Sequence, residues 1–154
     1  MLMTWNLAQF LHVNKQNMVS NLLKSEEINI LASGASWGWP EALRYIFRPR
    51  GVNLLVADST SDFVNIIEQR RIHTTIVDMD PEKSNAFTTI RIIRMRYPLL
   101  PCILLSSSRD EAMLSEALRL DVFSVIDKPV KIRILQEQLD RLFKKRYNSD
   151  IFAE

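Results

Sequence analysis

Three polar side chains with complementary chemistry stand at the ends of short apolar runs. Asp78 closes the run TTIVD, Ser106 closes CILLS, and Lys128 directly follows FSVID. A carboxylate can attack a phosphoryl group and become an acyl phosphate, while a hydroxyl and an ammonium group can bind the phosphoryl oxygens. The same residues also have a structural interpretation, in which Asp78 is the polar edge of a buried strand and Lys128 forms an ion pair beside it.

Either interpretation needs a fold that brings these distant residues together. Five apolar runs have the length and composition of buried strands, at residues 28–33, 52–58, 74–80, 101–106 and 122–127. Helical patterns separate and follow them, at residues 40–47, 62–71 and 86–97, from Ser108 onward, and through Leu135, Leu139 and Leu142. This alternation predicts an α/β fold with a parallel sheet covered on both faces.

Chemistry in such a sheet gathers outside the carboxyl ends of the strands. That edge is expected to carry Ala32 and Ser33 after the first strand and Asp58 after the second, together with the three polar residues above. Local signals support the helices. Pro40 suits a first turn, Ser108 and Glu111 have the spacing of a capping box, and the cations at 144–146 suit a helix C-terminus.

Composition limits the classes of function. The chain has 154 residues, 47% of them hydrophobic and 25% charged, which fits one globular domain. A net charge of +2 gives no nucleic-acid footprint, and the N-terminus has neither an export signal nor an apolar run long enough to span a membrane. The single Cys102 lies in an apolar run and is expected to be a buried thiol. We therefore expect a cytoplasmic protein that binds neither nucleic acid nor membrane.

A separate segment, residues 1–26, precedes the predicted sheet. Leu7, Leu11, Met18 and Leu22 fall near one helical face, which predicts an amphipathic helix. That helix either packs on its own domain or serves as a docking or dimerisation helix, and the sequence leaves both open.

The order of elements, Asp78, Ser106 and the DKP sequence at 127–129 together resemble the receiver domain of bacterial two-component response regulators. The resemblance covers residues 27–147 and leaves a tail at 148–154. It implies a flavodoxin-like (βα)5 doubly wound sheet in the strand order 2-1-3-4-5. It also implies that Asp78 is the phosphoacceptor, that Ser106 and Lys128 bind phosphoryl oxygens, and that the carbonyl of Asp80 is a magnesium ligand.

The resemblance fails at several positions of that site. The family places two acidic residues after its first strand to hold Mg²⁺, where this chain has Ala32 and Ser33. The family's aromatic reporter on the fifth strand is replaced by Val125, and its Gly-Ala pair after the fourth helix by Asp121 and Val122. Pro81 and Ala86 also alter the loop around the site. Magnesium relies on carboxylate oxygens, so it is not expected to bind unless Asp80 or Asp58 supplies a replacement.

These departures indicate a degenerate receiver, or pseudo-receiver, that acts as a protein-interaction module independently of phosphorylation. The alternative is a single-domain response regulator that accepts a phosphoryl group on Asp78. No Gly-rich phosphate loop, nucleophile with a base or metal cluster suggests an enzyme. The expected contact is a protein partner or a second copy of the chain. Its surface is either the face formed by the fourth helix, fifth strand and fifth helix, or the helix within residues 1–26.

Four other residues could carry a function, and each has a simpler interpretation. His12 lacks the acidic neighbour of a kinase phosphoacceptor, and His73 stands at the start of the third predicted strand, so neither is assigned a catalytic or metal-binding role. Trp37 and Trp39 follow the first strand, near the place of the missing acidic pair. They are expected either to plug the mouth of the site or to anchor a partner, and plugging is preferred.

Overall fold

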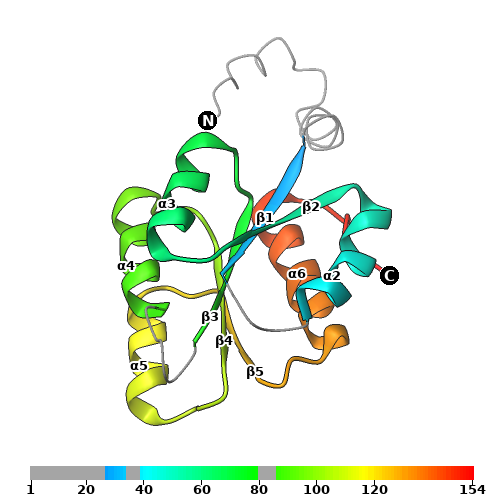
Figure 1. Ribbon diagram of the computed structural model, residues 1–154. Helices are drawn as coiled ribbons and strands as arrows, with labels where there is room; N and C mark the ends of the chain where they lie inside the picture. Colours follow the sequence, from blue (N-terminus) through cyan, green and yellow to red (C-terminus); the bar gives the residue numbers. More distant parts are fainter. Residues whose placement is uncertain (1–26, 34–38, 80–85) are drawn as a thin grey trace.

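The computed structural model describes residues 27–33, 39–79 and 86–154 as a five-stranded parallel sheet with helices on both faces (Figure 1). The strands are β1 (Ile28–Ser33), β2 (Val52–Ala57), β3 (Thr74–Asp78), β4 (Cys102–Ser106) and β5 (Ser124–Asp127). Their order in the sheet is β2-β1-β3-β4-β5, and each neighbouring pair is parallel. The predicted flavodoxin-like topology is therefore confirmed.

Five α-helices lie in the described part of the chain: α2 (Trp39–Phe47), α3 (Thr60–Gln69), α4 (Ala86–Arg96), α5 (Glu111–Arg119) and α6 (Ile132–Tyr147). A short 3-10 turn, η2 (Arg48–Arg50), follows α2. Figure 1 shows α2 and α6 on one face of the sheet and α3, α4 and α5 on the other. None of the helices described here is long and apolar enough to cross a membrane.

Alternate residues of each strand point to opposite faces and so build two separate cores. In β3, Ile76 belongs to the core beneath α2 and α6, and Val77 to the core beneath α3, α4 and α5. Both residues are at most 1% exposed. Cys102 lies in the second core, and burial raises the pKa of its thiol to about 11, as expected for an inert buried cysteine.

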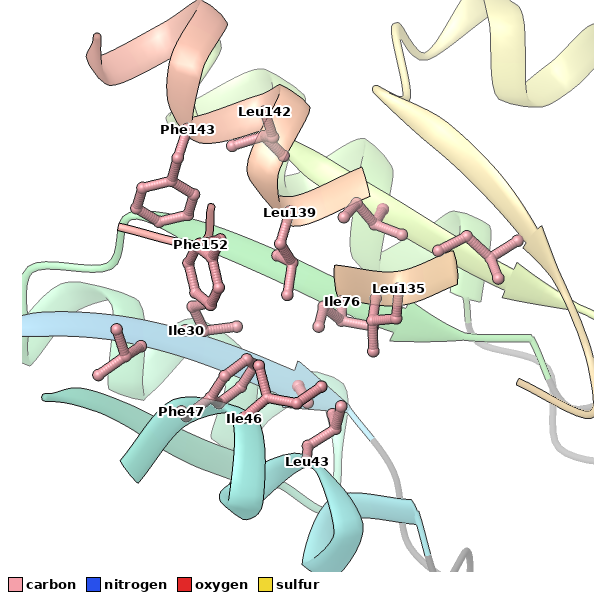
Figure 2. Close-up of a cluster of buried hydrophobic side chains, with 14 of the residues drawn as sticks. Ile30, Leu43, Ile46, Phe47, Ile76, Leu135, Leu139, Leu142, Phe143 and Phe152 are labelled. Carbon is pink, nitrogen blue, oxygen red and sulfur yellow. The ribbon is translucent and has the colours of Figure 1, made fainter. Parts of the chain in front are cut away.

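The core beneath α2 and α6 also includes the C-terminal segment (Figure 2). Phe152 is completely buried, and its ring lies 4.9 Å from that of Phe143 and 5.6 Å from that of Phe47, in edge-to-face geometry in both cases. Gln136 donates a hydrogen bond of 3.4 Å to the Phe152 carbonyl. Residues that were expected to form only a tail thus supply a large core side chain.

The capping box predicted at Ser108 is wrong. The helix α5 begins three residues later, and its N-cap is Asp110, whose carboxylate accepts a hydrogen bond of 2.8 Å from the Met113 amide. A carboxylate at the N-cap satisfies an open amide and interacts favourably with the helix dipole, so Asp110 competes successfully for this position. Ser108 instead donates to Asp110 at 3.2 Å.

The turn between α5 and β5 adopts a Schellman motif. The Val122 amide donates to the Ala117 carbonyl at 3.1 Å, and the Asp121 amide donates to the Leu118 carbonyl at 3.0 Å. Asp121 has a φ of 55°, in the left-handed region that favours glycine. The family's glycine at this position has a clear backbone reason, and here an aspartate occupies the same conformation.

Several predicted features lie outside the described residues. These are the amphipathic helix within residues 1–26, His12, Trp37, Asp80 and Pro81. Trp39 begins α2, but the structure does not describe its side chain.

Candidate functional site

The site lies where β1, β3, β4 and β5 end at the same edge of the sheet. Asp78 is the last residue of β3, and Lys128 directly follows β5. The Lys128 Nζ atom donates a hydrogen bond of 2.7 Å to Asp78 Oδ1 and one of 3.2 Å to the Met79 carbonyl. The predicted convergence of these two residues is therefore confirmed, and the carboxylate already holds a cation.

This ion pair is partly shielded from water. The side chain of Asp78 is 13% exposed and that of Lys128 is 24% exposed. A shielded pair gains more from Coulomb attraction than a surface pair, at the cost of removing both groups from water. The lysine therefore compensates the charge of the carboxylate without any phosphoryl group or metal.

The end of β1 presents a methyl group and a hydroxyl at this edge. Ala32 is completely buried and presents a methyl group, and Ser33 accepts a hydrogen bond of 2.9 Å from the Asp78 amide through its hydroxyl. The serine therefore ties β1 to β3 in the place where the family has a metal-binding carboxylate. The hydrogen bond to its hydroxyl positions the Asp78 backbone.

Ser106 also participates in local structure. It is 1% exposed, and its hydroxyl donates to the Ser108 carbonyl at 2.8 Å and accepts from the Ser108 amide at 3.1 Å. Its carbonyl accepts from the Lys128 amide at 3.0 Å, which fixes the start of the segment carrying the lysine. The serine hydroxyl closes the turn after β4, because both of its hydrogen-bonding functions are satisfied there.

The residues described at this edge do not fit Mg²⁺. The ion prefers an octahedral set of oxygens that includes carboxylates. Here the side chain of Ala32 offers no oxygen, and Asp78 Oδ1 and the Met79 carbonyl both accept from Lys128. Among the described residues, no three His, Cys, Asp or Glu side chains form a group that could hold a metal ion. Asp58 directly follows β2 and has an exposed side chain, and Asp80 lies outside the described residues.

Arg109 is a residue of this edge that the sequence did not single out. It donates to the Val125 carbonyl at 2.9 Å and forms an ion pair with the Asp127 carboxylate. The guanidinium thus links the loop after β4 to the edge strand β5. Val125 itself is half-buried and packs against the core beneath α3, α4 and α5. Its short branched side chain cannot rotate between inward and outward positions as an aromatic ring can.

A groove of about 1240 Å³ runs from this edge along β5 and α6. Seven of its lining residues are basic and two, Asp121 and Asp127, are acidic. Sequence analysis missed this concentration of charge, because the cations come from the loop before α5, the loop after β5 and the last turns of α6. The cations form one basic surface only because the fold places these segments side by side.

The histidine in the described part of the chain has a structural role. His73 is 1% exposed at the opposite end of β3, where its Nδ1 atom accepts a hydrogen bond of 3.1 Å from the Asn29 amide. Burial, with a contribution from the charge of Arg71, lowers the pKa of His73 to about 4. The imidazole therefore lies at the opposite edge of the sheet from Asp78 and Lys128 and accepts a backbone hydrogen bond there.

Comparisons with known proteins identify the family. Residues 39–140 match the response regulator receiver domain. No curated protein matches the chain. The structure is similar to a CheY-like receiver domain protein of Methanospirillum hungatei, with a TM-score of 0.71 and 15% identity over 80% of this chain and 98% of that one.

Two further solved structures show the same fold. The signal receiver domain of an HD domain-containing protein from Pseudomonas fluorescens has a TM-score of 0.70 and 17% identity, covering 80% of this chain and all of that one. A receiver protein from Pseudomonas putida has a TM-score of 0.65 and 23% identity, covering 76% and 98%. Because the family match spans residues 39–140, which is more than half of the chain, the chain belongs to the response regulator receiver domain family.

Proposed function

We propose that this chain is a degenerate receiver that acts as a protein-interaction module in bacterial signal transduction, independently of phosphorylation. One observation carries the proposal. Where a working receiver needs two metal-binding carboxylates, Ala32 presents a methyl group and the Ser33 hydroxyl accepts from the Asp78 amide. A phosphoryl group transferred to Asp78 would add negative charge without the cation that normally compensates it.

A second observation concerns the residues that would couple the site to the binding surface. A switch needs two conformations whose equilibrium the phosphoryl group shifts. Here Val125 is packed in place of the family's aromatic residue, and the Ser106 hydroxyl is engaged within its own turn. The binding surface is therefore proposed to keep one conformation, whatever the state of Asp78.

The output must then come through surfaces of the domain. The face formed by α5, β5 and α6 is one candidate, and the segment 1–26 is the other. We assign residues 27–147 to the receiver-like domain and 148–154 to a C-terminal segment that packs on it through Phe152. Neither an enzymatic activity nor a resident magnesium ion is part of this proposal, and the proposed location is the cytoplasm.

The contact between Asp78 and Lys128 favours a second candidate, a phosphorylatable single-domain response regulator. An acceptor carboxylate with a lysine 2.7 Å away has two of the required groups in place. This alternative also needs a further oxygen ligand for a metal ion beside Asp78. Asp80 is the acidic residue nearest to Asp78 in the sequence that could supply it. The two proposals differ in whether partner binding depends on Asp78.

The test compares Asp78→Asn, Asp78→Ala and a deletion of residues 1–24. Each variant is assayed for self-association by analytical ultracentrifugation and for partner capture from the native host, with folding checked by circular dichroism. We expect both Asp78 variants to retain the partners of the wild type. Loss of partners in a folded Asp78 variant would support the phosphorylatable regulator, whereas loss only in the deletion would assign binding to the N-terminal segment.

A further inference from the structure

The groove along β5 and α6 has its charges at two ends. Near the site, Arg109, Lys128 and Lys131 line one end. At the far end, the last turns of α6 contribute Arg141, Lys144, Lys145 and Arg146. The wall between the two ends is formed by β5 and the first half of α6.

Apolar side chains, among them Phe123, Val125 and Ile134, line the wall between the two ends. Ile134 and Gln138 lie on the same face of α6 as Arg141 and Lys145, since their spacing of four, three and four residues repeats with the helix turn. Ile134 is 39% exposed, although it is a large hydrophobic residue. This stripe is about 16 Å long at 1.5 Å per residue, and it changes from apolar to basic along its length.

Several of the cations are available to a ligand. Within the described residues, Arg109 and Lys128 already hold Asp127 and Asp78, and Lys144 holds Asp140. Lys131, Arg141 and Lys145 are exposed and form no such ion pair with a described carboxylate. A surface that keeps unpaired like charges together gains free energy when an acidic partner neutralises them.

We infer that this groove binds an acidic segment of a protein partner, with carboxylates at both ends of the segment and apolar residues between them. The inference rests on the proposed function and specifies its partner. The carboxylates pair with Lys131 at one end and with Arg141 and Lys145 at the other, and the apolar centre covers Ile134 and the edge of β5. Asp121 and Asp127 oppose such a ligand, but Asp127 is already neutralised by Arg109.

The charge pattern argues against the other occupants. A second copy of the chain would place one basic groove against another, and like charges across an interface oppose binding. Residues 1–26 carry two lysines, Lys15 and Lys24, and one glutamate, so they do not complement the groove. Nucleic acid presents a phosphate about every 3.4 Å along each strand, which would place phosphates against the apolar middle.

The experiment measures binding of a fluorescein-labelled peptide of about 16 residues, with glutamates at both ends and leucines and valines between them. Fluorescence anisotropy is recorded with the full chain at about 50 and 200 mM NaCl. The same peptide with lysine in place of every glutamate and a double-stranded DNA of similar length serve as alternative probes. The groove variant is the double substitution Arg141→Glu and Lys145→Glu, because both side chains are exposed and unpaired.

A control reverses the same number of charges elsewhere, with Arg48→Glu on η2 and Arg96→Glu on α4, where Arg96 forms an exposed ion pair of 3.8 Å with Glu68. We expect the acidic peptide to bind the wild type and the control equally, and the groove variant at least about tenfold more weakly. Equal weakening in both variants, equal binding of the lysine peptide, or absence of binding to the acidic peptide would overturn the inference. Binding of DNA alone through the groove would do the same and assign the surface to nucleic acid.

The Asp78→Asn variant separates the inference from the proposed function. We expect it to bind the acidic peptide as the wild type does. If binding depends on both the groove and Asp78, the groove inference stands and the proposal of phosphorylation independence fails. If binding is independent of both, the groove inference fails while the proposed function is untouched.

Discussion

At the scale of single residues, the ion pair between Lys128 and Asp78 distinguishes this site from a cluster of carboxylates. In a working receiver several acidic groups repel one another, so removing one charge relieves repulsion. Here the described partner of Asp78 is a lysine at 2.7 Å. The carboxylate should therefore stabilise the fold. Its removal is expected to lower the stability of this chain, whereas it would raise the stability of a site made of several carboxylates.

We predict that Asp78→Asn lowers the free energy of unfolding by about 1 kcal/mol, because the asparagine cannot form the ion pair but has nearly the same shape. Urea denaturation at neutral pH measures the change. Lys128→Met is the partner variant, and the double variant should show that the two losses are not additive. An increase in stability in Asp78→Asn would show that other carboxylates surround it.

His73 predicts a specific dependence of stability on pH. Its pKa is about 4 in the folded chain, below its ordinary value of 6.5, because burial and the charge of Arg71 disfavour the imidazolium. Between these values the unfolded chain binds more protons than the folded one, so stability rises with pH. This contribution is complete above pH 6.5 and is lost as the pH falls toward 4.

Between pH 7 and pH 5, the wild type should lose about 2 kcal/mol more than a His73→Gln variant, which has no titrating ring. Urea denaturation of both proteins at the two pH values provides the comparison. Carboxylates titrate in both proteins, so only the difference between them reports on His73. Parallel losses would contradict the assignment of a buried, neutral histidine.

At the scale of elements, the helix boundaries show which parts of the fold the sequence predicted well. The strands and helices lie where apolar periodicity indicated. The spacing of apolar residues differs between an element that is buried on one face and one that is buried on both faces. The ends differ by a few residues. The start of α5 was missed because Ser108 and Asp110 are both good caps, and only the backbone path selects between them.

Asp121 gives a prediction for one of these boundaries. It holds a left-handed conformation at the C-terminus of α5, which costs a residue with a Cβ atom more than glycine. Asp121→Gly should therefore stabilise the chain by about 0.5–1 kcal/mol, and Asp121→Ala should destabilise it. Thermal unfolding of the three proteins should give the order glycine, aspartate, alanine, and an alanine variant as stable as the glycine variant would be inconsistent with the turn.

At the scale of the whole molecule, two features could not be predicted because they depend on contacts between distant segments. The basic groove joins cations from three separate parts of the chain, which look unremarkable in a sequence of net charge +2. The burial of Phe152 depends on where the chain turns after α6. Conversely, the convergence of Asp78 and Lys128 was predictable, because parallel strands bring their carboxyl ends to one edge.

Phe152 also tests whether the C-terminal segment is part of the domain. Its ring fills the space between Phe47 and Phe143, so Phe152→Ala should leave a cavity and lower the free energy of unfolding by about 3–5 kcal/mol. Glu154→Ala is the matched control on the exposed end of the same segment, with an expected change below about 0.5 kcal/mol. Chemical denaturation measures both, and a loss below about 1 kcal/mol in Phe152→Ala would show that the core does not need this segment.

We propose that the site does not bind the metal on which phosphorylation of a working receiver depends. The most direct measurement is the melting temperature of the full chain with and without millimolar Mg²⁺, because a ligand at about 100 times its Kd adds about 2.7 kcal/mol of stability. Restoring carboxylates by Ser33→Asp, alone and with Ala32→Asp, provides the positive control, and the double variant should gain a shift. We predict no shift in the wild type. An upward shift in the wild type that Asp78→Asn abolishes would contradict the account.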